Sequence, residues 1–352
     1  MNSATTEQTG RLGGLDLARY LAFVGRVIVN FKVVMGAETS GGILAAATGA
    51  LEGRAAALFV ILAGIGLGLA GTKGISQTVG VTVKRAVFLL AIGLLNMLVF
   101  DADILHYYAF YFLFGALLLR SGTRLLVAGI VMLNVAFVVL ILILNYDTGW
   151  NWNNYSYTGF WTPTGFIRNL FFNGWHPVIP WLGFLLFGII LSRTSLARRS
   201  VQRKLLFGGV VTAGIAEAFS RFITPRLGAL DVELAVFGST HPVPPMPLYT
   251  LAGIGTSSIA IGACLLISGW AQSAGLMRLV VPAGRQTLTL YIAHILVGMW
   301  TLEALGMLGG QSIVSATVAA LIFSLLATIY AFIWNQKFKR GPIESLMRKV
   351  AG

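Results

Sequence analysis

Long apolar stretches alternate with short polar connections along the whole chain. A hydrocarbon core roughly 30 Å thick needs about 20 apolar residues in each helix that crosses it. Because the alternating pattern of a transmembrane strand is absent, helices are the only spanning element left. The pattern therefore predicts an all-α, polytopic membrane bundle with about ten transmembrane helices, at residues 15–36, 54–72, 81–100, 103–120, 124–146, 176–193, 204–223, 249–269, 286–304 and 311–336.

Composition and charge agree with a membrane bundle and set its orientation. Hydrophobic residues make up 57% of the chain and charged residues 11%. Most of the 25 lysines and arginines fall in every second connection, together with the two ends of the chain, whereas acidic residues fall in the others. Since cytoplasmic loops concentrate Lys and Arg, both termini are predicted to be cytoplasmic. The same bias explains the net charge of +13 without nucleic acid as a partner.

The orientation depends on particular residues. The basic groups include Arg11, Arg19, Lys73, Lys84, Arg85, Arg120, Arg124, Arg193, Arg198, Arg199, Arg203, Lys204, Arg278, Arg285, Lys337, Lys339, Arg340, Arg348 and Lys349. The opposite connections hold Glu38, Glu52, Asp101, Asp103, Asp147, Asp231, Glu233 and Glu303. With this register, the four histidines are expected in the outer half of the membrane or near its middle.

The first predicted helix carries an unusual polar stripe. At 100° per residue, Arg19, Arg26 and Asn30 fall within about 20° of one line, and Asp16 can pair with Arg19. Charges at membrane depth cost at least a few kcal/mol each, so they usually face a cavity or a partner. The stripe therefore indicates a substrate path. The alternative is an internal ladder of ion pairs that only holds helices together.

Two histidines are candidate bases on the outer side. Asp103 and His106 stand three residues apart, so the carboxylate can orient the imidazole, although Asp103 can equally be a helix cap. His176 precedes Pro177 at a helix start, where it can take a proton from an acceptor; a structural role is the alternative.

A third group leads from the cytoplasmic end towards mid-membrane. Thr287, Tyr291 and His294 share one helix face, and Arg285 at its mouth can hold a phosphate. The alternative is a cytoplasmic anchor followed by hydrogen bonds between helices.

The outer loop alternates aromatic rings with amides, and both suit a sugar. Trp152 lies in this loop and Trp175 beyond it, although an interfacial aromatic belt has the same composition. The chain has no Gly-rich phosphate loop, no HExxH zinc motif and no Gly-x-Ser-x-Gly elbow. Its one cysteine, Cys264, excludes an internal disulfide and a cysteine-based metal site, so no metal is predicted.

Taken in order, seven short segments resemble the YeiB-type family, a bacterial family of unknown function within the transmembrane acyltransferase superfamily that includes heparan-alpha-glucosaminide N-acetyltransferase. The similarity covers nearly the whole chain, from the first helix to the C-terminal end. The segments are Leu15-Asp16-Leu17-Ala18-Arg19 with Gly25 and Asn30; Gly53-Arg54 to Phe59 with Leu62-Ala63-Gly64; Asp103-Ile104-Leu105-His106-Tyr107; His176-Pro177 with Pro180-Trp181; Pro245 with Pro247-Leu248-Tyr249; Gly284-Arg285 with Leu288-Thr289 and Tyr291; and Gly341-Pro342-Ile343-Glu344 with Arg348.

The resemblance implies a single transmembrane acyltransferase-like domain over residues 1–352, multi-pass in a bacterial cytoplasmic membrane. It implies a cytoplasmic acyl-CoA donor, typically acetyl-CoA, and an extracytoplasmic acceptor such as a sugar hydroxyl or amine, a glycan or a small molecule. A homodimer is left open. Arg26 is a departure, because the family usually has an apolar residue there; a His often stands in place of Asn30.

The implied roles follow the predicted topology. Donor-binding residues are Arg285, Arg26, Arg19, Thr287, Tyr291 and His294. Asn30 and Arg26 would stabilise the thioester oxygen, and His176 or His106, the latter with Asp103, would be the base. Arg54, Trp152 and Trp175 would bind the acceptor. The alternatives are a transporter or flippase that uses the buried polar stripe as its path, and a non-catalytic scaffold.

Overall fold

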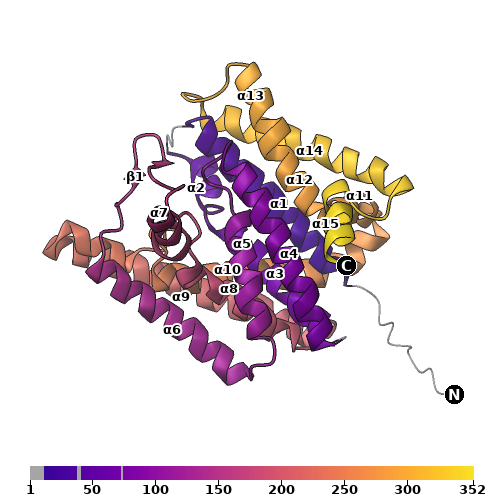
Figure 1. Cartoon of the computed structure of the whole chain (residues 1–352), viewed down its shortest axis with the longest axis horizontal. Helices are drawn as coiled ribbons and strands as arrows, with labels where there is room; N and C mark the ends of the chain where they lie inside the picture. The colour runs from indigo at the N-terminus through magenta and orange to yellow at the C-terminus, as the bar shows by residue number, and fades with distance from the viewer. Residues whose placement is uncertain (1–11, 38–40, 73) are drawn as a thin grey trace.

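The computed structural model describes residues 12–37, 41–72 and 74–352, and these form a bundle of helices with one short hairpin (Figure 1). The all-α prediction is confirmed. The first half contains α1 (Gly13–Val34), α2 (Ile43–Gly49), α3 (Arg54–Gly71), α4 (Ile75–Asn96), α5 (Leu105–Leu117) and α6 (Thr123–Ile143).

The second half begins with a hairpin and contains two π-helical turns. The strands β1 (Trp150–Asn151) and β2 (Ser156–Tyr157) pair antiparallel. The helices that follow are α7 (Pro163–Arg168), the π-turn η1 (Asn169–Asn173), α8 (Val178–Ser192), α9 (Arg199–Leu230), the 3₁₀ segment η2 (Val232–Gly238), α10 (Pro247–Ser273), α11 (Leu276–Arg285), α12 (Thr287–Ala293), the π-turn η3 (His294–Met299), α13 (Trp300–Ala304), α14 (Ile313–Lys337) and α15 (Pro342–Ala351).

Within the described residues, seven helical segments are long and apolar enough to cross a membrane, so the chain is a multi-pass membrane protein. They are the run α2–α3, then α4, α6, α9, α10, the run α12–α13, and α14. An eighth is obtained if the pair Pro163–Asn173 and Val178–Ser192, bent by 51°, counts as one span. Each of the ten predicted spans overlaps a helix.

The count of ten and the cytoplasmic side of both termini stay predictions. The helix α1 falls outside the seven because it carries Asp16, Arg19, Arg26 and Lys32. Three residues used for the orientation, Arg11, Glu38 and Lys73, lie outside the described residues.

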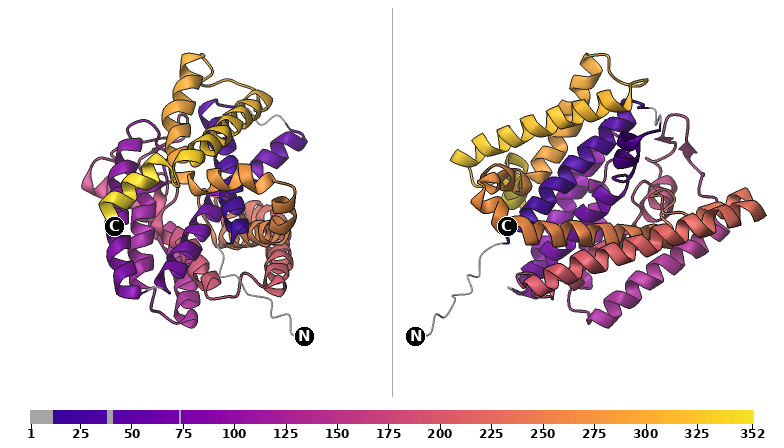
Figure 2. Two further views of the ribbon diagram at one scale, coloured as in Figure 1. Left: turned by 90° about the vertical axis from the view of Figure 1, so that its right-hand side faces the viewer. Right: turned by 180° about the vertical axis from the view of Figure 1, so that it is seen from behind.

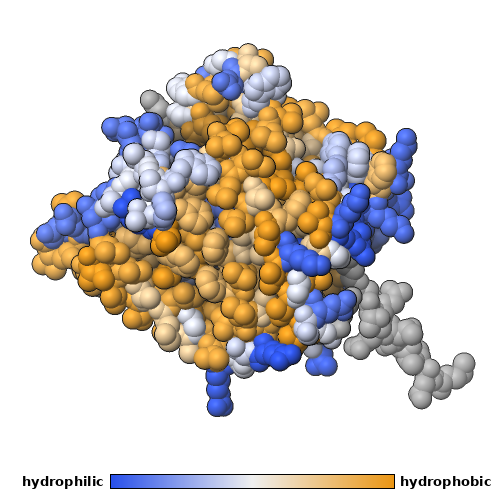
Figure 3. Space-filling view, in the orientation of Figure 1, coloured by the Kyte–Doolittle hydropathy of each residue, from blue (hydrophilic) through white to orange (hydrophobic). Residues whose placement is uncertain are grey.

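The outer surface agrees with a bilayer environment. Large apolar side chains are exposed on the peripheral helices, for example Val87 of α4, Met132 of α6, Ile215 of α9 and Leu325 of α14. Figure 3 shows the resulting apolar face, with hydrophilic residues gathered at its edges. An exposed apolar surface of this extent marks a membrane or partner contact. The back view in Figure 2 shows α9 at the periphery, packed along α10.

Glycines let α3 and α8 approach to backbone contact. A Cβ atom on Gly64 would overlap the carbonyl oxygen of Leu185, and one on Gly188 would overlap that of Ile61. A Cβ on Gly68 would overlap the Ser192 hydroxyl. Small residues at such positions permit close helix packing in membranes. By contrast, a Cβ on Gly66 would meet only an Arg19 nitrogen, at 3.9 Å.

This difference in packing predicts that alanine at Gly64 and alanine at Gly66 affect the stability of the protein differently. Gly64→Ala should lower the free energy of unfolding by about 1–3 kcal/mol, because α8 must move away. Gly66→Ala should be neutral, or stabilising by roughly 0.5–1 kcal/mol through helix propensity. Thermal unfolding in detergent measures both; equal melting temperatures for the two variants would contradict the packing described.

Candidate functional site

The centre of the site is Arg26, which is buried in the middle of α1 with 5% of its surface exposed. Its Nη2 donates to the carbonyl oxygen of Ala102 at 2.9 Å. Its Nη1 lies 3.2 Å from Nε2 of His176. Because a guanidinium has only donors, Nε2 of His176 must be the acceptor. The imidazole is therefore neutral, with its proton on Nδ1.

The histidine is held from three sides. Its carbonyl oxygen accepts a 2.5 Å hydrogen bond from the Tyr111 hydroxyl, and its ring meets that of Trp181 edge-on at 4.7 Å. The π-turn η1 ends three residues earlier, and such turns occur frequently at functional sites. His176 is thus rigidly placed, with its Nε2 lone pair directed at Arg26.

A second buried pair lies one turn further along α1. The Asn30 amide nitrogen lies 2.8 Å from Nε2 of His294, whose Nδ1 hydrogen-bonds the carbonyl oxygen of Tyr291. Since a carbonyl only accepts, Nδ1 carries the proton and Nε2 accepts from Asn30. The π-turn η3 begins at His294.

Asp103 is a structural anchor as well as a candidate site residue. Its carboxylate accepts from the backbone nitrogen of Leu105 at 2.7 Å, the Asn96 amide at 3.2 Å and the Tyr291 hydroxyl at 3.1 Å. It therefore caps the start of α5 and ties it to α12. His106 lies 3.8 Å from this carboxylate, beyond hydrogen-bonding distance. Within the described part of the chain, neither ring nitrogen of His106 has a partner.

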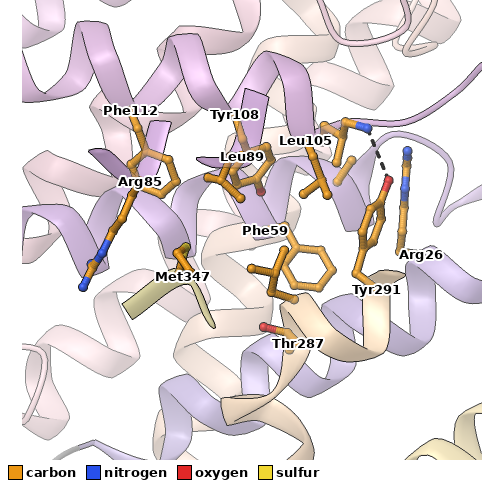
Figure 4. Close-up of a pocket in the computed structure, with 13 residues that line it drawn as sticks. Arg26, Phe59, Arg85, Leu89, Leu105, Tyr108, Phe112, Thr287, Tyr291 and Met347 are labelled. Atoms are coloured by element: carbon orange, nitrogen blue, oxygen red, sulfur yellow. Dashed lines mark hydrogen bonds between the residues drawn. The ribbon is translucent and has the colours of Figure 1, made fainter. Parts of the chain in front are cut away.

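An apolar cavity of about 200 Å³ runs from Arg26 to Arg85 (Figure 4). Arg26 and Tyr291 stand at one end, and Arg85 and Met347 at the other. The walls between them are mostly apolar or aromatic, with Phe59, Leu89, Leu105, Tyr108 and Phe112, and Thr287 adds a hydroxyl group. This cavity suits an extended apolar chain with a polar group at its Arg26 end.

A basic cavity of about 610 Å³ adjoins the Arg85 end, since Arg85 and Met347 line both cavities. Its basic lining residues are Arg85, Arg285, Lys339, Arg340 and Arg348.

Glu344 is the carboxylate in this cavity, and its oxygens are engaged. They accept from the backbone nitrogens of Leu288 at 2.8 Å and Thr289 at 3.1 Å, and from the Thr289 hydroxyl. The carboxylate thereby caps the start of α12 from α15. Burial raises the pKa of Glu344, and the Thr289 hydrogen bonds oppose that rise. Among the described residues, Arg85, Lys339, Arg340 and Arg348 form no ion pair with a carboxylate, so their charges are available to an anion, whereas Arg285 lies 3.5 Å from Asp16.

A cavity of about 640 Å³ adjoins the contact of Arg26 with Ala102, because Ala102, whose carbonyl accepts from Arg26, is part of its lining. It is called the outer cavity because it lies on the side predicted to be extracytoplasmic. Its polar and aromatic lining residues are Phe100, Asp101, Asn154, Tyr155, Trp175, Trp300 and Glu303, and apolar side chains complete it. Burial raises the pKa of Asp101. Arg26 thus stands between an apolar cavity and an acidic, aromatic one.

The remaining predicted residues divide between the cavities and other contacts. Thr287 lines the apolar cavity and Arg285 the basic one. Asp16 lies between Arg19, at 2.6 Å, and Arg285, at 3.5 Å.

Two predicted acceptor residues lie apart from the outer cavity. Arg54 forms an ion pair with Glu217 of α9. Trp152 stacks on Trp150 with ring centroids 4.6 Å apart and donates to Asp147. Trp175, by contrast, lines the outer cavity.

Several residues that line the cavities could not be identified as site residues from the sequence. Arg85 and Arg348 come from α4 and α15, and in the sequence they look like cytoplasmic anchoring charges. Asp101 and Glu303 look like ordinary loop or helix-end acids. No local pattern brings these pairs together. Among the described residues, no group of three or more His, Cys, Asp or Glu side chains could hold a metal ion.

Comparison with known proteins identifies the family of the chain. Residues 11–217 match the family model described as "Heparan-alpha-glucosaminide N-acetyltransferase, catalytic", and residues 234–352 match "Protein of unknown function (DUF418)". No curated protein and no solved structure matches. The first match covers more than half of the chain, and the second is the YeiB-type model expected from the motifs. The buried Arg26, Asn30 and His176 and most of the apolar cavity lie within the first match, so the chain belongs to the YeiB-type family of the transmembrane acyltransferase superfamily, related to the heparan-alpha-glucosaminide N-acetyltransferase catalytic domain.

Proposed function

We propose that this membrane protein transfers an acyl group, acetyl being the simplest, from a cytoplasmic acyl-CoA to an acceptor on the other side of the membrane. One observation carries the proposal: the apolar cavity joins a basic cavity at Arg85 to the buried Arg26, beyond which the acidic and aromatic outer cavity begins. A donor with a phosphorylated head and a long thioester arm fits this order of environments.

The donor's phosphates would bind in the basic cavity. Arg285, Arg340 and Arg348 offer forked donors that match phosphate oxygens. The arm of the donor would follow the apolar cavity past Met347 and Phe59. Its thioester carbonyl would then reach Arg26 and Tyr291, which stand at the far end.

Arg26 and His176 would perform the chemistry together. When the thioester carbonyl arrives, the guanidinium can donate to that oxygen and stabilise the negative charge that develops on it. This change releases Nε2 of His176, which then accepts the proton of the attacking hydroxyl or amine. The acceptor bonds to the carbonyl carbon, the carbon–sulfur bond breaks, and the thiolate takes the proton from His176. Asn30 and His294 would support the adjacent part of α1.

The acceptor would enter from the outer cavity. Trp175, Tyr155 and Trp300 offer ring faces, and Asn154 an amide, to a sugar-like molecule. The carboxylates of Asp101 and Glu303 can accept from its hydroxyls or attract its amine. This arrangement favours a hydroxyl or amine acceptor over a carboxylate-bearing one.

The two matched segments would act as one domain. Arg26, Phe59 and Tyr108 of the apolar cavity come from the first segment, whereas Thr287 and Tyr291 come from the second. Neither segment encloses the cavity alone.

The chemistry predicts the effect of two substitutions. Arg26→Met should lower kcat by about 10²–10³ through loss of an oxyanion donor. His176→Gln should lower kcat by about 10²–10⁴ through loss of the base. The measurement is transfer of label from acetyl-CoA by purified protein in vesicles, with a panel of sugars and amines outside. Label that stays on the donor across the whole panel with the unaltered protein would contradict the proposed function.

The donor site predicts a difference between two arginines. Arg340→Gln should weaken binding of coenzyme A about tenfold, because a hydrogen bond to a charged group is lost. Arg124→Gln is the matched control: Arg124 is exposed at the start of α6 and lines none of the cavities described. Equilibrium dialysis of coenzyme A against each protein gives both dissociation constants. If both substitutions weaken binding of coenzyme A equally, the effect comes only from the overall positive charge of the protein and not from a specific site.

The outer cavity predicts selectivity between acceptors. Asp101→Asn should lower kcat/KM for amine acceptors, which are cations before reaction, roughly tenfold more than for sugar hydroxyls. The ratio of the two losses is measured in the same vesicle assay. A loss of equal size for both acceptor types would argue against contact between Asp101 and the amine.

A further inference from the structure

A lateral groove adjoins the proposed reaction path, with which it shares Arg85, Phe112 and Arg348. It has a volume of about 710 Å³ and runs between α3 and α4, with Phe112 of α5 and the C-terminal helix at its sides. Its walls are mostly apolar, from Leu62 to Ala70 of α3 and Val81 of α4. The polar part of the lining consists of Gln77, Thr78 and Thr82 of α4 and the arginines Arg19, Arg85 and Arg348, and Gly352 completes it.

Gly66 faces this groove and has no packing reason to be glycine. Gly64 and Gly68, two residues to either side, are needed for the contact with α8, as shown above. A Cβ on Gly66 would instead meet only Arg19, at 3.9 Å. Glycine inside a helix costs roughly 0.5–1 kcal/mol relative to alanine. A side chain at Gly66 would, however, project into the groove, so the glycine keeps the groove open.

Among the described residues, two of the three arginines of the groove form no ion pair with an acidic side chain. Arg19 contacts Asp16. In the part of the chain that the structure describes, neither Arg85 nor Arg348 forms an ion pair with a carboxylate, and Nε of Arg85 is buried without a partner. Two guanidinium groups on one apolar groove repel each other unless an anion lies between them.

We propose that the lateral groove binds one anionic phospholipid. Its phosphate lies between Arg85 and Arg348, and an acyl chain lies over Gly66 against Leu62 and Leu67. Apolar walls with arginines beside them match a lipid, whereas the nucleotide part of a donor would need polar partners along the walls. Basic pockets between transmembrane helices bind anionic headgroups for this reason.

The proposal goes beyond acyl transfer and has a consequence for it. Arg85 and Arg348 line both the groove and the basic cavity. A lipid phosphate that holds these two side chains also fixes one wall of the basic cavity. Anionic lipid would therefore be a structural partner of the protein even in the absence of any donor.

Native mass spectrometry tests the proposal without an acyl donor. The purified protein is incubated with equal amounts of phosphatidylglycerol and phosphatidylcholine of identical chains. We expect one phosphatidylglycerol to remain bound per chain in preference to phosphatidylcholine. Arg348→Gln should reduce that preference about fivefold, the effect of one basic residue near a lipid surface. Gly66→Leu should fill the groove and abolish retention of the lipid.

The matched control is Gly214→Leu. Gly214 is exposed on α9, and a Cβ there meets nothing within 4 Å, so it makes the same change of residue type away from the groove. It should leave lipid retention unchanged.

Equal retention of the two lipids by the unaltered protein overturns the proposal, as does equal retention by Gly66→Leu and Gly214→Leu. If Gly66→Leu does not fold, Arg348→Gln alone decides, and an unchanged preference in that variant overturns the proposal.

Discussion

The buried guanidinium of Arg26 is the constraint on which the site depends. A charge buried among apolar helices is costly unless it has hydrogen-bond partners. Arg26 finds two acceptors, Ala102 and His176, which lie 76 and 150 residues further along the chain. Satisfying one side chain therefore brings α1, the α4–α5 connection and the start of α8 together. The cavities then form on either side of that junction.

The polar groups around this junction are linked through Tyr291, whose hydroxyl donates to Asp103 and whose carbonyl accepts from His294. Asn30 hydrogen-bonds His294, and Asp103 hydrogen-bonds Tyr291. Each pair joins α1 or α5 to the last third of the chain. Because buried polar atoms without partners are costly, these pairs also specify which helices pack together. The same contacts that hold the bundle thus position the candidate reactive groups.

Helical periodicity predicts the polar stripe on α1 but not the partners of all its residues. Arg19, Arg26 and Asn30 do lie on one helix face, as periodicity requires. Their partners differ, however: Asp16 is three residues from Arg19, whereas His176 and His294 are more than 100 residues from theirs. The local pair could be predicted from spacing. The two distant ones could not, since spacing along a helix says nothing about which other helix faces it.

The sequence by itself determined the helical membrane class, the approximate position of ten of the helices and the family. These follow from hydropathy, charge bias and short motifs, which act over one or two turns of chain. Only the tertiary structure decided that Arg26 separates two cavities and that Arg85 and Arg348 line the same cavity. It also decided that Gly66 faces a groove, whereas Gly64 packs against α8. The physical reason is that a cavity is the space left between side chains of several helices, and its walls exist only once those helices have packed.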